Sequence, residues 1–334
     1  MSSLSPAFLV ACAMVLAGLV GGFAGEVTPP RPIVHRAGYR VLEGDFHTHT
    51  AWSDGSLSPF GVVRQADRRG LDVVAITEHN TVWPSRFARW YANGTTRPLA
   101  VTGEEVTTAR FHVIAVGIEQ TVSPDQSLEE VIAAIHAQHG AAIVAHPVSH
   151  YWPTVLPLRE RFDAAEVMHP IAYAERNAEW RWADMVRFHE EAKTPLGAIG
   201  SSDYHWMSVL GVCRTLVFVT EPVTQASVVD AIREHHTVTL DREGHAYGDA
   251  ALIEALRAEP YVPRTSDYEY RGSSALDRVL RTIGWLGLVG VVLLRARRRD
   301  SRGYRRLIDA TGELQFLRRA KRSPLRTRTG SAWK

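Results

Sequence analysis

Short apolar segments that alternate with helical patterns are the feature that most constrains how this chain can fold. The segments typical of buried strands lie at residues 41–46, 71–76, 99–102, 111–117, 141–145, 163–167 and 196–200. Strands and helices that alternate in this way predict a parallel sheet in an α/β fold, most economically a barrel. The chain has 334 residues, 45% of them hydrophobic, which excludes intrinsic disorder and a disulfide-stapled miniprotein.

Helix boundaries are marked by capping signals at two places. Ser58 followed by Pro59 is typical of a helix N-cap and first turn, and Gly70 is a suitable residue to end that helix. Ser127 and Glu130 have the spacing of a capping box. We expect helices over residues 58–70, 127–140, 175–193 and 224–234, and a further strand over residues 237–240.

Histidines and carboxylates follow nearly every predicted strand. The chain has 15 histidines but only two cysteines, so a metal site would have to be built from imidazoles and carboxylates. Because the carboxyl ends of parallel barrel strands converge on one face, these side chains should meet there. They are His47, His49, Asp54, Glu78, His79, Glu104, Glu105, His112, His146, Glu166, His169, Asp203 and His205. The pattern predicts a metal site.

The spacing of two histidines supports this prediction locally. His47 and His49 are two residues apart at a strand end, so both side chains point to the same face and can bind one ion. Neutral imidazoles combined with carboxylates suit Zn, Mn or Fe better than Ca or Mg. A carboxylate with two oxygens can bridge two ions, and Glu105 is the candidate for that role.

Six sequence stretches together resemble a known family. They are DFHTHTAWSDG (45–55), ITEHN (76–80), TGEEV (102–106), HVIAVG (112–117), AHP (145–147) and GSSDYH (200–205). In this order they resemble the PHP family, the polymerase and histidinol phosphatase type of metal-dependent phosphoesterase, over about half of the chain. The resemblance implies a distorted (βα)7 barrel with two or three divalent metal ions at the C-terminal ends of its strands.

The resemblance also implies a set of ligands and two departures from the usual pattern. It places His47, His49, Glu105 and Asp203 around a first metal, Glu105, His112 and His146 around a second, and Asp54, His79 and His205 around a third. Glu78 stands where an Asp is usual, and His169 replaces the customary Asn. Glu104 is adjacent to Glu105, and the usual pattern favours Glu105 as the ligand.

The predicted site favours a hydrolase. Metal ions would activate water for attack on a small-molecule phosphoester and neutralise the phosphate charge, with no covalent enzyme intermediate. His79 or His205 would assist proton transfer as catalytic residues. Two alternatives stay open. One is a hydrolase of the same fold that acts on a carboxylic ester, carbamate or amide, and the other is a non-catalytic, membrane-anchored binding module.

The two ends of the chain differ in charge from its body. Residues 295–334 contain 14 lysines and arginines against three carboxylates, so this tail carries +11 and the preceding residues carry −9. Residues 7–25 contain no charged side chain, which is typical of a signal peptide or a membrane anchor. Residues 273–294 form a second candidate span, for which a helix in the plane of the interface is the alternative.

These features predict the domain order. We expect a signal peptide or anchor at 1–25, a linker at 26–40, the hydrolase domain at 41–260, a linker at 261–272, a transmembrane segment at 273–294 and a basic tail at 295–334. The positive-inside rule places the tail in the cytoplasm and the hydrolase domain outside it, in the periplasm or the extracellular space. Nothing like an aromatic stacking platform interleaves the arginines of the tail, so nucleic acid is a weaker partner than anionic lipid.

Four other residues lie near the predicted ligands in the sequence. Arg110 and Tyr204 either contact a phosphate or serve a structural role. Trp83 and Trp152 are expected on loops after strands, where they either pack against the core or line a substrate cleft.

Overall fold

The computed structural model describes residues 5–24, 32–93, 98–173, 180–205, 209–261 and 278–297. These residues fall into two compact units, one spanning residues 28–270 and one that joins residues 1–27 to residues 271–334. Parts of the predicted linkers, third helix, membrane segment and basic tail lie outside the described residues, at 26–31, 175–179, 262–277 and 298–334.

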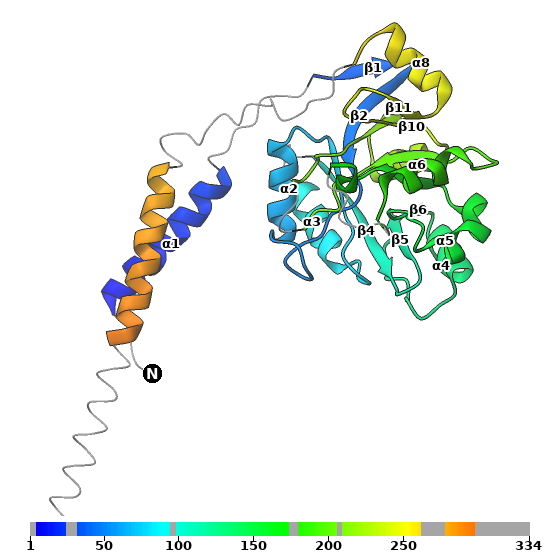
Figure 1. Ribbon diagram of the computed structural model, residues 1–334. Helices are drawn as coiled ribbons and strands as arrows, with labels where there is room; N and C mark the ends of the chain where they lie inside the picture. The colour runs from blue at the N-terminus through cyan, green and yellow to red at the C-terminus, as the bar shows by residue number, and fades with distance from the viewer. Residues whose placement is uncertain are drawn as a thin grey trace, which may run out of the picture. The chain divides into compact units, whose positions relative to one another are not determined.

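The described residues of the larger unit contain an 11-stranded sheet, drawn in Figure 1. Its strands are β1 (Val34–Arg36), β2 (Tyr39–Asp45), β3 (Val73–Ile76), β4 (Leu99–Thr107), β5 (His112–Val116), β6 (Ala141–Val144), β7 (Ala164–Met168), β8 (Gly197–Gly200), β9 (Thr215–Val219), β10 (Thr237–Leu240) and β11 (Ala246–Gly248). The order across the sheet is β11-β10-β9-β2-β3-β4-β5-β6-β7-β8, with β1 paired to β2. The seven predicted strands and the additional strand at 237–240 are all present, as β2 to β8 and β10.

The prediction of an entirely parallel sheet is wrong at β5. Strands β2, β3 and β4 are parallel neighbours, as are β6, β7 and β8, but β5 runs antiparallel to both β4 and β6. The connection from β4 to β5 is a short turn in which the amide of Thr108 donates to the carbonyl of Phe111 over 3.1 Å. Parallel strands need a crossover of a dozen or more residues, so this turn imposes a hairpin.

Strand β9 was not predicted, and it completes the barrel. It lies antiparallel to both β2 and β10, so it joins the first long strand to the last part of the domain. One side chain of β9 also connects it to the end of β8: the Thr215 hydroxyl accepts from the Gly200 amide and donates to the Gly200 carbonyl, each over 2.9 Å. The result is an α/β distorted barrel with a nearly closed mixed sheet, which confirms the predicted fold class.

The helices follow the predicted capping signals. They are α2 (Pro59–Arg68), α3 (Trp83–Asn93), α4 (Leu128–His136), α5 (Trp152–Val155), η1 (Leu156–Arg161), η2 (Pro170–Tyr173), α6 (Trp182–Glu190), α7 (Gln225–Arg233) and α8 (Ala250–Ala258). The Ser58 side chain accepts from the amide of Gly61, and both hydrogen bonds of the Ser127–Glu130 capping box are present. Gly70 has a φ of +72°, as expected for the residue that ends α2.

Two predictions about helical segments are wrong. Trp83 does not lie on a loop but begins α3, and Trp152 begins α5. The Trp152 indole donates to the carbonyl of Pro147 over 2.9 Å and packs against the core, so it serves packing. Within the described residues, the predicted helix at 175–193 is limited to α6, because Arg181 has the extended backbone of a residue that precedes a helix.

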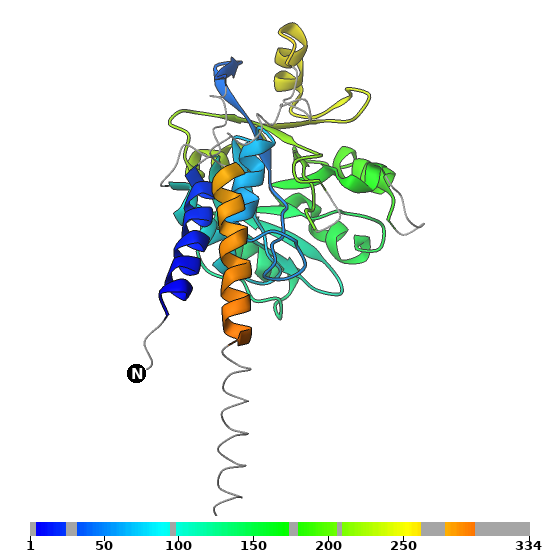
Figure 2. The ribbon, with the colours of Figure 1, turned by 90° about the vertical axis from the view of Figure 1, so that its left-hand side faces the viewer.

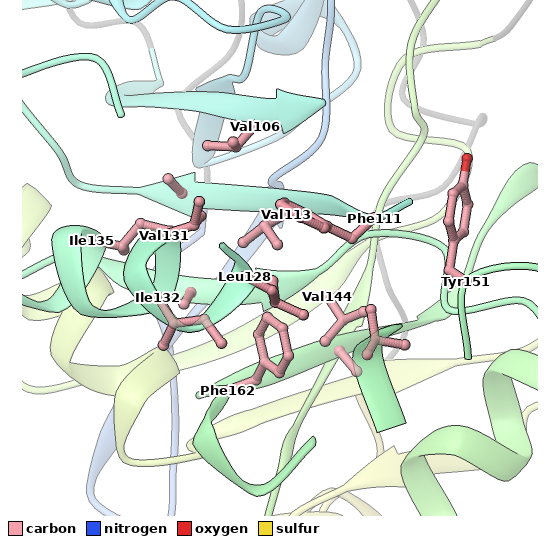
Figure 3. Packing of buried hydrophobic residues seen from close by; sticks show 14 of the residues in the cluster. Val106, Phe111, Val113, Leu128, Val131, Ile132, Ile135, Val144, Tyr151 and Phe162 are labelled. Carbon is pink, nitrogen blue, oxygen red and sulfur yellow. The ribbon is translucent and has the colours of Figure 1, made fainter. Parts of the chain in front are cut away.

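A hydrophobic cluster holds α4 against the sheet next to β5. Figure 3 shows Leu128, Val131, Ile132 and Ile135 of α4 packing toward side chains of β5, β6 and their connections. Phe111, fully buried in this cluster, immediately precedes β5. The cluster therefore fixes the position of the strand that carries His112.

We expect Ile135→Ala to lower the free energy of unfolding by about 2–5 kcal/mol, because the fully buried side chain leaves a cavity. Urea unfolding followed by circular dichroism measures the change. Glu129→Gln, on the exposed side of the same helix, is the matched control. It should change stability by less than about 1 kcal/mol, since the ion pair of Glu129 with Arg161 is exposed. Equal losses in the two variants would contradict the packing.

The smaller unit contains two helices among its described residues, α1 (Pro6–Ala24) and a helix spanning Arg278–Arg297. Figure 1 and Figure 2 both show these two helices side by side. By length and composition, Arg278–Arg297 could cross a membrane, and Pro6–Leu19 of α1 is a shorter apolar stretch.

Candidate metal centre

The carboxylate of Glu105 lies at the centre of a cluster of histidines. Glu105 is on β4 and is 1% exposed. Its two oxygens lie between 2.8 and 3.7 Å from ring nitrogens of His47, His49, His79, His112 and His146. The shortest contacts, both 2.8 Å, are from Nδ1 of His79 to Oε2 and from Nδ1 of His112 to Oε1. One acidic side chain thus contacts five histidines from four different segments.

Strand geometry explains why His47 and His49 point into this cluster. Both follow β2, and the residue between them, Thr48, points the other way, where its hydroxyl donates to the carbonyl of Ala75 over 2.7 Å. The alternation agrees with the two-residue periodicity of extended backbone. Both imidazoles are fully buried.

Asp203 is a second acidic centre beside Glu105. Its Oδ1 lies 3.2 Å from Nε2 of His47 and 3.2 Å from Nε2 of His49, and its Oδ2 lies 3.2 Å from Nε2 of His169. Asp203 has a φ of +42° and His146 has a φ of +28°. Residues other than glycine rarely adopt this left-handed backbone conformation. Such strain is typical of functional sites, where the surrounding structure holds it in place.

A third group lies at the exposed side of the cluster. Oδ2 of Asp54 is 3.3 Å from Nε2 of His79 and 3.2 Å from Nε2 of His205. The side chain of Asp54 is 49% exposed, against 26% for His79 and 34% for His205. Gly55 lets this loop pass close to His49, because a Cβ at Gly55 would lie 2.5 Å from the His49 carbonyl oxygen.

The structure brings all nine predicted ligands into this cluster. Three groupings have ligand atoms within 4.8 Å of one another: His49, Asp54, His79 and His205; His47, His49 and Asp203; and His47, Glu105 and His146. The ninth residue, His112, is outside these groupings but hydrogen-bonds to Glu105. Their role as metal ligands stays a prediction.

Another grouping, Asp241, Glu243 and His245, lies in the turn between β10 and β11. There Asp241 accepts backbone hydrogen bonds from Glu243 and His245, which is the ordinary arrangement of a tight turn.

The cluster fits a divalent transition metal. Among the described residues, the buried ring nitrogens His47 Nε2, His49 Nδ1, His49 Nε2 and His146 Nδ1 form no well-aligned hydrogen bond, although some lie near carboxylates. Buried polar atoms are normally satisfied, so these nitrogens need a partner of another kind. Imidazole nitrogens with carboxylate oxygens form the donor set of Zn, Mn or Fe sites. The identity and number of the ions stay predictions.

The carboxylates and imidazoles strongly perturb one another. Burial by itself disfavours the charge on His49, but the carboxylates of Asp203 and Glu78 outweigh it and raise the His49 pKa to about 9. Burial would also raise the pKa of Glu105, yet the positive charge of His47 and hydrogen bonds from His112 and His146 hold it well below its ordinary value. Without a metal ion, the positive charge that these carboxylates favour on His49 therefore offsets part of their own charge.

Glu166 and Glu78, which were not among the predicted ligands, contact two of the predicted ligands, His47 and His49 respectively. Glu166 is fully buried on β7. Its carboxylate is hydrogen-bonded to Nδ1 of His47 over 3.0 Å and accepts a hydrogen bond from the amide of His146 over 2.5 Å. Burial opposes its charge, but His47 outweighs this effect and lowers the Glu166 pKa to about 2. Such partners orient metal-binding imidazoles. In the sequence, only the position of Glu166 near the end of a predicted strand indicated that it lies at the site.

Glu78, in the position where an Asp is usual, anchors the loop that carries Asp54. Its carboxylate accepts from the amide and hydroxyl of Thr50 and from the hydroxyl of Ser53, and lies 3.7 Å from Nδ1 of His49. The longer side chain of Glu therefore connects the third group of donors to the buried ones.

The remaining predicted neighbours have structural roles or lie apart. Glu104 points away from the histidines and accepts from the amide of Val122. Tyr204 is buried and its hydroxyl lies 2.6 Å from the hydroxyl of Ser56, so it joins two loops of the site. Arg110 is exposed in the turn before β5. His169, in place of the customary Asn, hydrogen-bonds to Asp203.

Comparisons with known proteins identify the fold. No family model matches the sequence. The chain is 29% identical over 123 residues to an uncharacterized protein of Methanocaldococcus jannaschii, MJ1587, a match that spans 32% of this chain and 69% of the relative. A two-domain protein from Bacteroides vulgatus, which contains a predicted PHP-like metal-dependent phosphoesterase, matches 70% of this chain and 74% of its own with a TM-score of 0.56 and 20% identity.

A further solved structure resembles the chain less well. An amidohydrolase from Chromobacterium violaceum, with bound sulfate and no metal, covers 60% of this chain and 99% of its own at 17% identity, with a TM-score of 0.43. The Bacteroides vulgatus structure shows that this chain has a PHP-like fold, and the histidine and carboxylate cluster lies where the sequence motifs predicted it.

We expect Glu166→Gln to weaken metal binding by about 10–100-fold, because His47 loses the charged partner that orients its ring. Titration of the metal-free protein with Zn2+ and Mn2+ measures the affinity. Glu160→Gln is the matched control: the Glu160 pKa is also lowered to about 2, but by hydrogen bonds from Thr194 and Lys193 on the surface. Unchanged affinity in Glu166→Gln would contradict the orienting role.

Metal binding should release protons at neutral pH. The raised pKa of His49, about 9, means that its ring is protonated at pH 7 in the metal-free protein and must lose that proton to bind an ion. The apparent affinity should therefore rise with pH up to about 9. Calorimetry in buffers of different ionisation enthalpy counts the released protons. Binding without proton release and an affinity independent of pH between 6 and 9 would refute this expectation.

Proposed function

We propose that the chain is a metal-dependent hydrolase that cleaves phosphoesters at this centre. The observation that carries the proposal is the buried carboxylate of Glu105 among five histidines, next to a half-exposed group of further donors. Divalent ions bound there supply Lewis acidity and lower the pKa of a water molecule. Buried donors hold ions firmly, whereas donors at the exposed side are close to the solvent from which a substrate arrives.

His79 and His205 are placed to hold and move protons at the exposed side. The carbonyl of Asp203 accepts from Nδ1 of His205 over 2.8 Å. Because a carbonyl can only accept, Nδ1 carries a hydrogen, and Nε2 of the same ring lies 3.2 Å from Oδ2 of Asp54. In His79, Nδ1 faces Glu105 and the hydroxyl of Thr107, and Nε2 also faces Asp54. Either Nε2 can give a proton to a leaving oxygen unless an ion occupies it.

Asp54 holds both Nε2 atoms at the exposed side of the cluster. Its loop is anchored by Glu78 through Thr50 and Ser53 and is packed against the backbone of His49 at Gly55. The outer donors are therefore held by the same side chains that support the buried donors. An arrangement of this kind positions a reacting group without a conformational change in the site.

Two features favour a phosphoester over a carboxylic ester, carbamate or amide. Three adjacent donor groupings allow more than one ion to contact the oxygens of a phosphate and neutralise its charge. The sequence motifs and the fold also resemble PHP-like phosphoesterases. A carboxylic ester, carbamate or amide has less charge to neutralise, and so makes less use of neighbouring ions.

Turnover by the purified full chain, loaded with Zn2+, Mn2+ or Fe2+, tests the proposal. We expect hydrolysis of phosphate monoesters or diesters with nitrophenol leaving groups, lost on chelation. His49→Ala should lower kcat/KM by on the order of 10²-fold or more, because it removes a buried nitrogen from the site. His35→Ala, at an exposed histidine outside the cluster, should leave turnover unchanged.

Three results would count against a phosphoesterase. No phosphoester turnover above that of His49→Ala would refute the proposal. Faster hydrolysis of carboxylic esters or amides would assign the centre to the other class of hydrolase. Less than one equivalent of tightly bound metal would favour a non-catalytic binding module.

A further inference from the structure

The two helices of the smaller unit contact each other through glycine residues. A Cβ built on Gly18 would lie 2.5 Å from Cα of Gly284, and a Cβ on Gly287 would lie 2.7 Å from the carbonyl oxygen of Ala11. Real Cβ atoms do not approach other atoms this closely, so the contact requires glycine at both positions. The backbones of α1 and Arg278–Arg297 therefore touch directly.

The contacts show that the two helices run in opposite directions. Gly18, in the second half of α1, faces Gly284 near the start of Arg278–Arg297, whereas Ala11 faces Gly287 and Gly290 further along it. Nearer the N-terminus of α1, the ring of Phe8 lies 5.9 Å from the guanidinium carbon of Arg295. The pair is thus an antiparallel helical hairpin. In the sequence, its two helices are separated by the whole of the larger unit, residues 28–270.

The outer faces of this hairpin are apolar and uncovered. Large hydrophobic side chains that are exposed on the two helices are Leu9, Val10, Leu16, Leu19, Val279, Trp285, Leu286, Leu288, Val289, Val292 and Leu293. Only 6% of the candidate span in Arg278–Arg297 is buried. An exposed apolar surface of this extent marks an interaction site. These side chains lie on the outer faces of both helices. The hydrocarbon chains of lipids can cover outer faces of this kind on both helices at once, whereas a single groove of a protein cannot.

Length and charge agree with a bilayer as the covering partner. The 19 residues of α1 and the 20 residues of Arg278–Arg297 correspond to about 28 and 30 Å of helix, close to the thickness of a hydrocarbon core. Arginines lie near the ends of the second helix, at positions 278, 281, 295 and 297, from which their side chains can reach the two interfaces. In membranes, small residues at a contact allow helices to pack closely.

We propose that α1 is retained in the mature protein and pairs with Arg278–Arg297 as a two-helix anchor in a lipid bilayer. The start of α1 and the end of Arg278–Arg297 then lie on one side of the membrane. The larger unit, which connects the other two helix ends in the sequence, lies on the opposite side. The proposal is independent of the hydrolase function. It excludes removal of α1 as a secretory signal, because removal would leave Gly284 and Gly287 without the partner that requires them.

Disulfide cross-linking of the full chain in membranes of a bacterial host tests the pairing. In a Cys12→Ser background, Ala11→Cys with Gly290→Cys should form a disulfide, because a Cβ at Gly290 would lie 3.3 Å from Cβ of Ala11, close to the separation found in disulfides. Leu16→Cys with Gly290→Cys is the matched control, since Leu16 is 61% exposed on the outer face. We expect a several-fold higher yield of the linked peptide, detected by mass spectrometry, from the first pair.

Two measurements on the unmodified chain complete the test. The intact mass of the membrane-extracted protein should include residues 5–24, and the protein should stay with the membrane in alkaline carbonate. A mature chain that lacks α1, release into the carbonate supernatant, or equal cross-linking in both cysteine pairs would each overturn the proposal. None of these outcomes depends on hydrolase activity.

Discussion

The rest of the structure depends on the contact between one buried carboxylate, Glu105, and the imidazoles around it. A carboxylate that is 1% exposed is stable only with charged or metal partners, since burying an unpaired charge is strongly unfavourable. The histidines that provide these partners come from loops after β2, β3 and β6 and from β5 itself. Glu166 and Glu78 are needed in turn to orient them. The strained backbone at His146 and Asp203 persists because the surrounding contacts determine it.

The antiparallel hairpin of β4 and β5 allows the contact between Glu105 and His112. A parallel strand after β4 would carry its first residue to the opposite end of the sheet. The hairpin instead pairs Thr107 with His112 and Glu105 with Ile114, so His112 stays within hydrogen-bond distance of Glu105. The departure from a regular βα repeat is therefore what allows one strand to supply the carboxylate and the next strand to supply an imidazole.

Features with a local cause could be predicted from the sequence, and features that depend on distant contacts could not. The strands β2 to β8 and the caps at Ser58 and Ser127 follow from periodicity and from side chains a few residues apart. The nine clustered residues were found because they follow strand ends or belong to recognised motifs. Strand β9 was missed because its place is set by pairing with β2. The role of Glu166 depends on contacts with His47 and His146, which lie in other segments.

The loops after β2 and β8 are joined by backbone hydrogen bonds, in which Tyr204 donates to His47 and accepts from His49. Asp45 likewise accepts from the amide of Ser202, 157 residues further along the chain. A chain emerging from the ribosome therefore presents His47 and His49 long before Asp203 exists, and β9 emerges later still. The complete set of donors forms only after the segments of β2 and β8 have both been synthesised and have packed together. The proposed metal centre would therefore take up its ions in the compartment where these segments come together, and not necessarily the one in which the chain is synthesised.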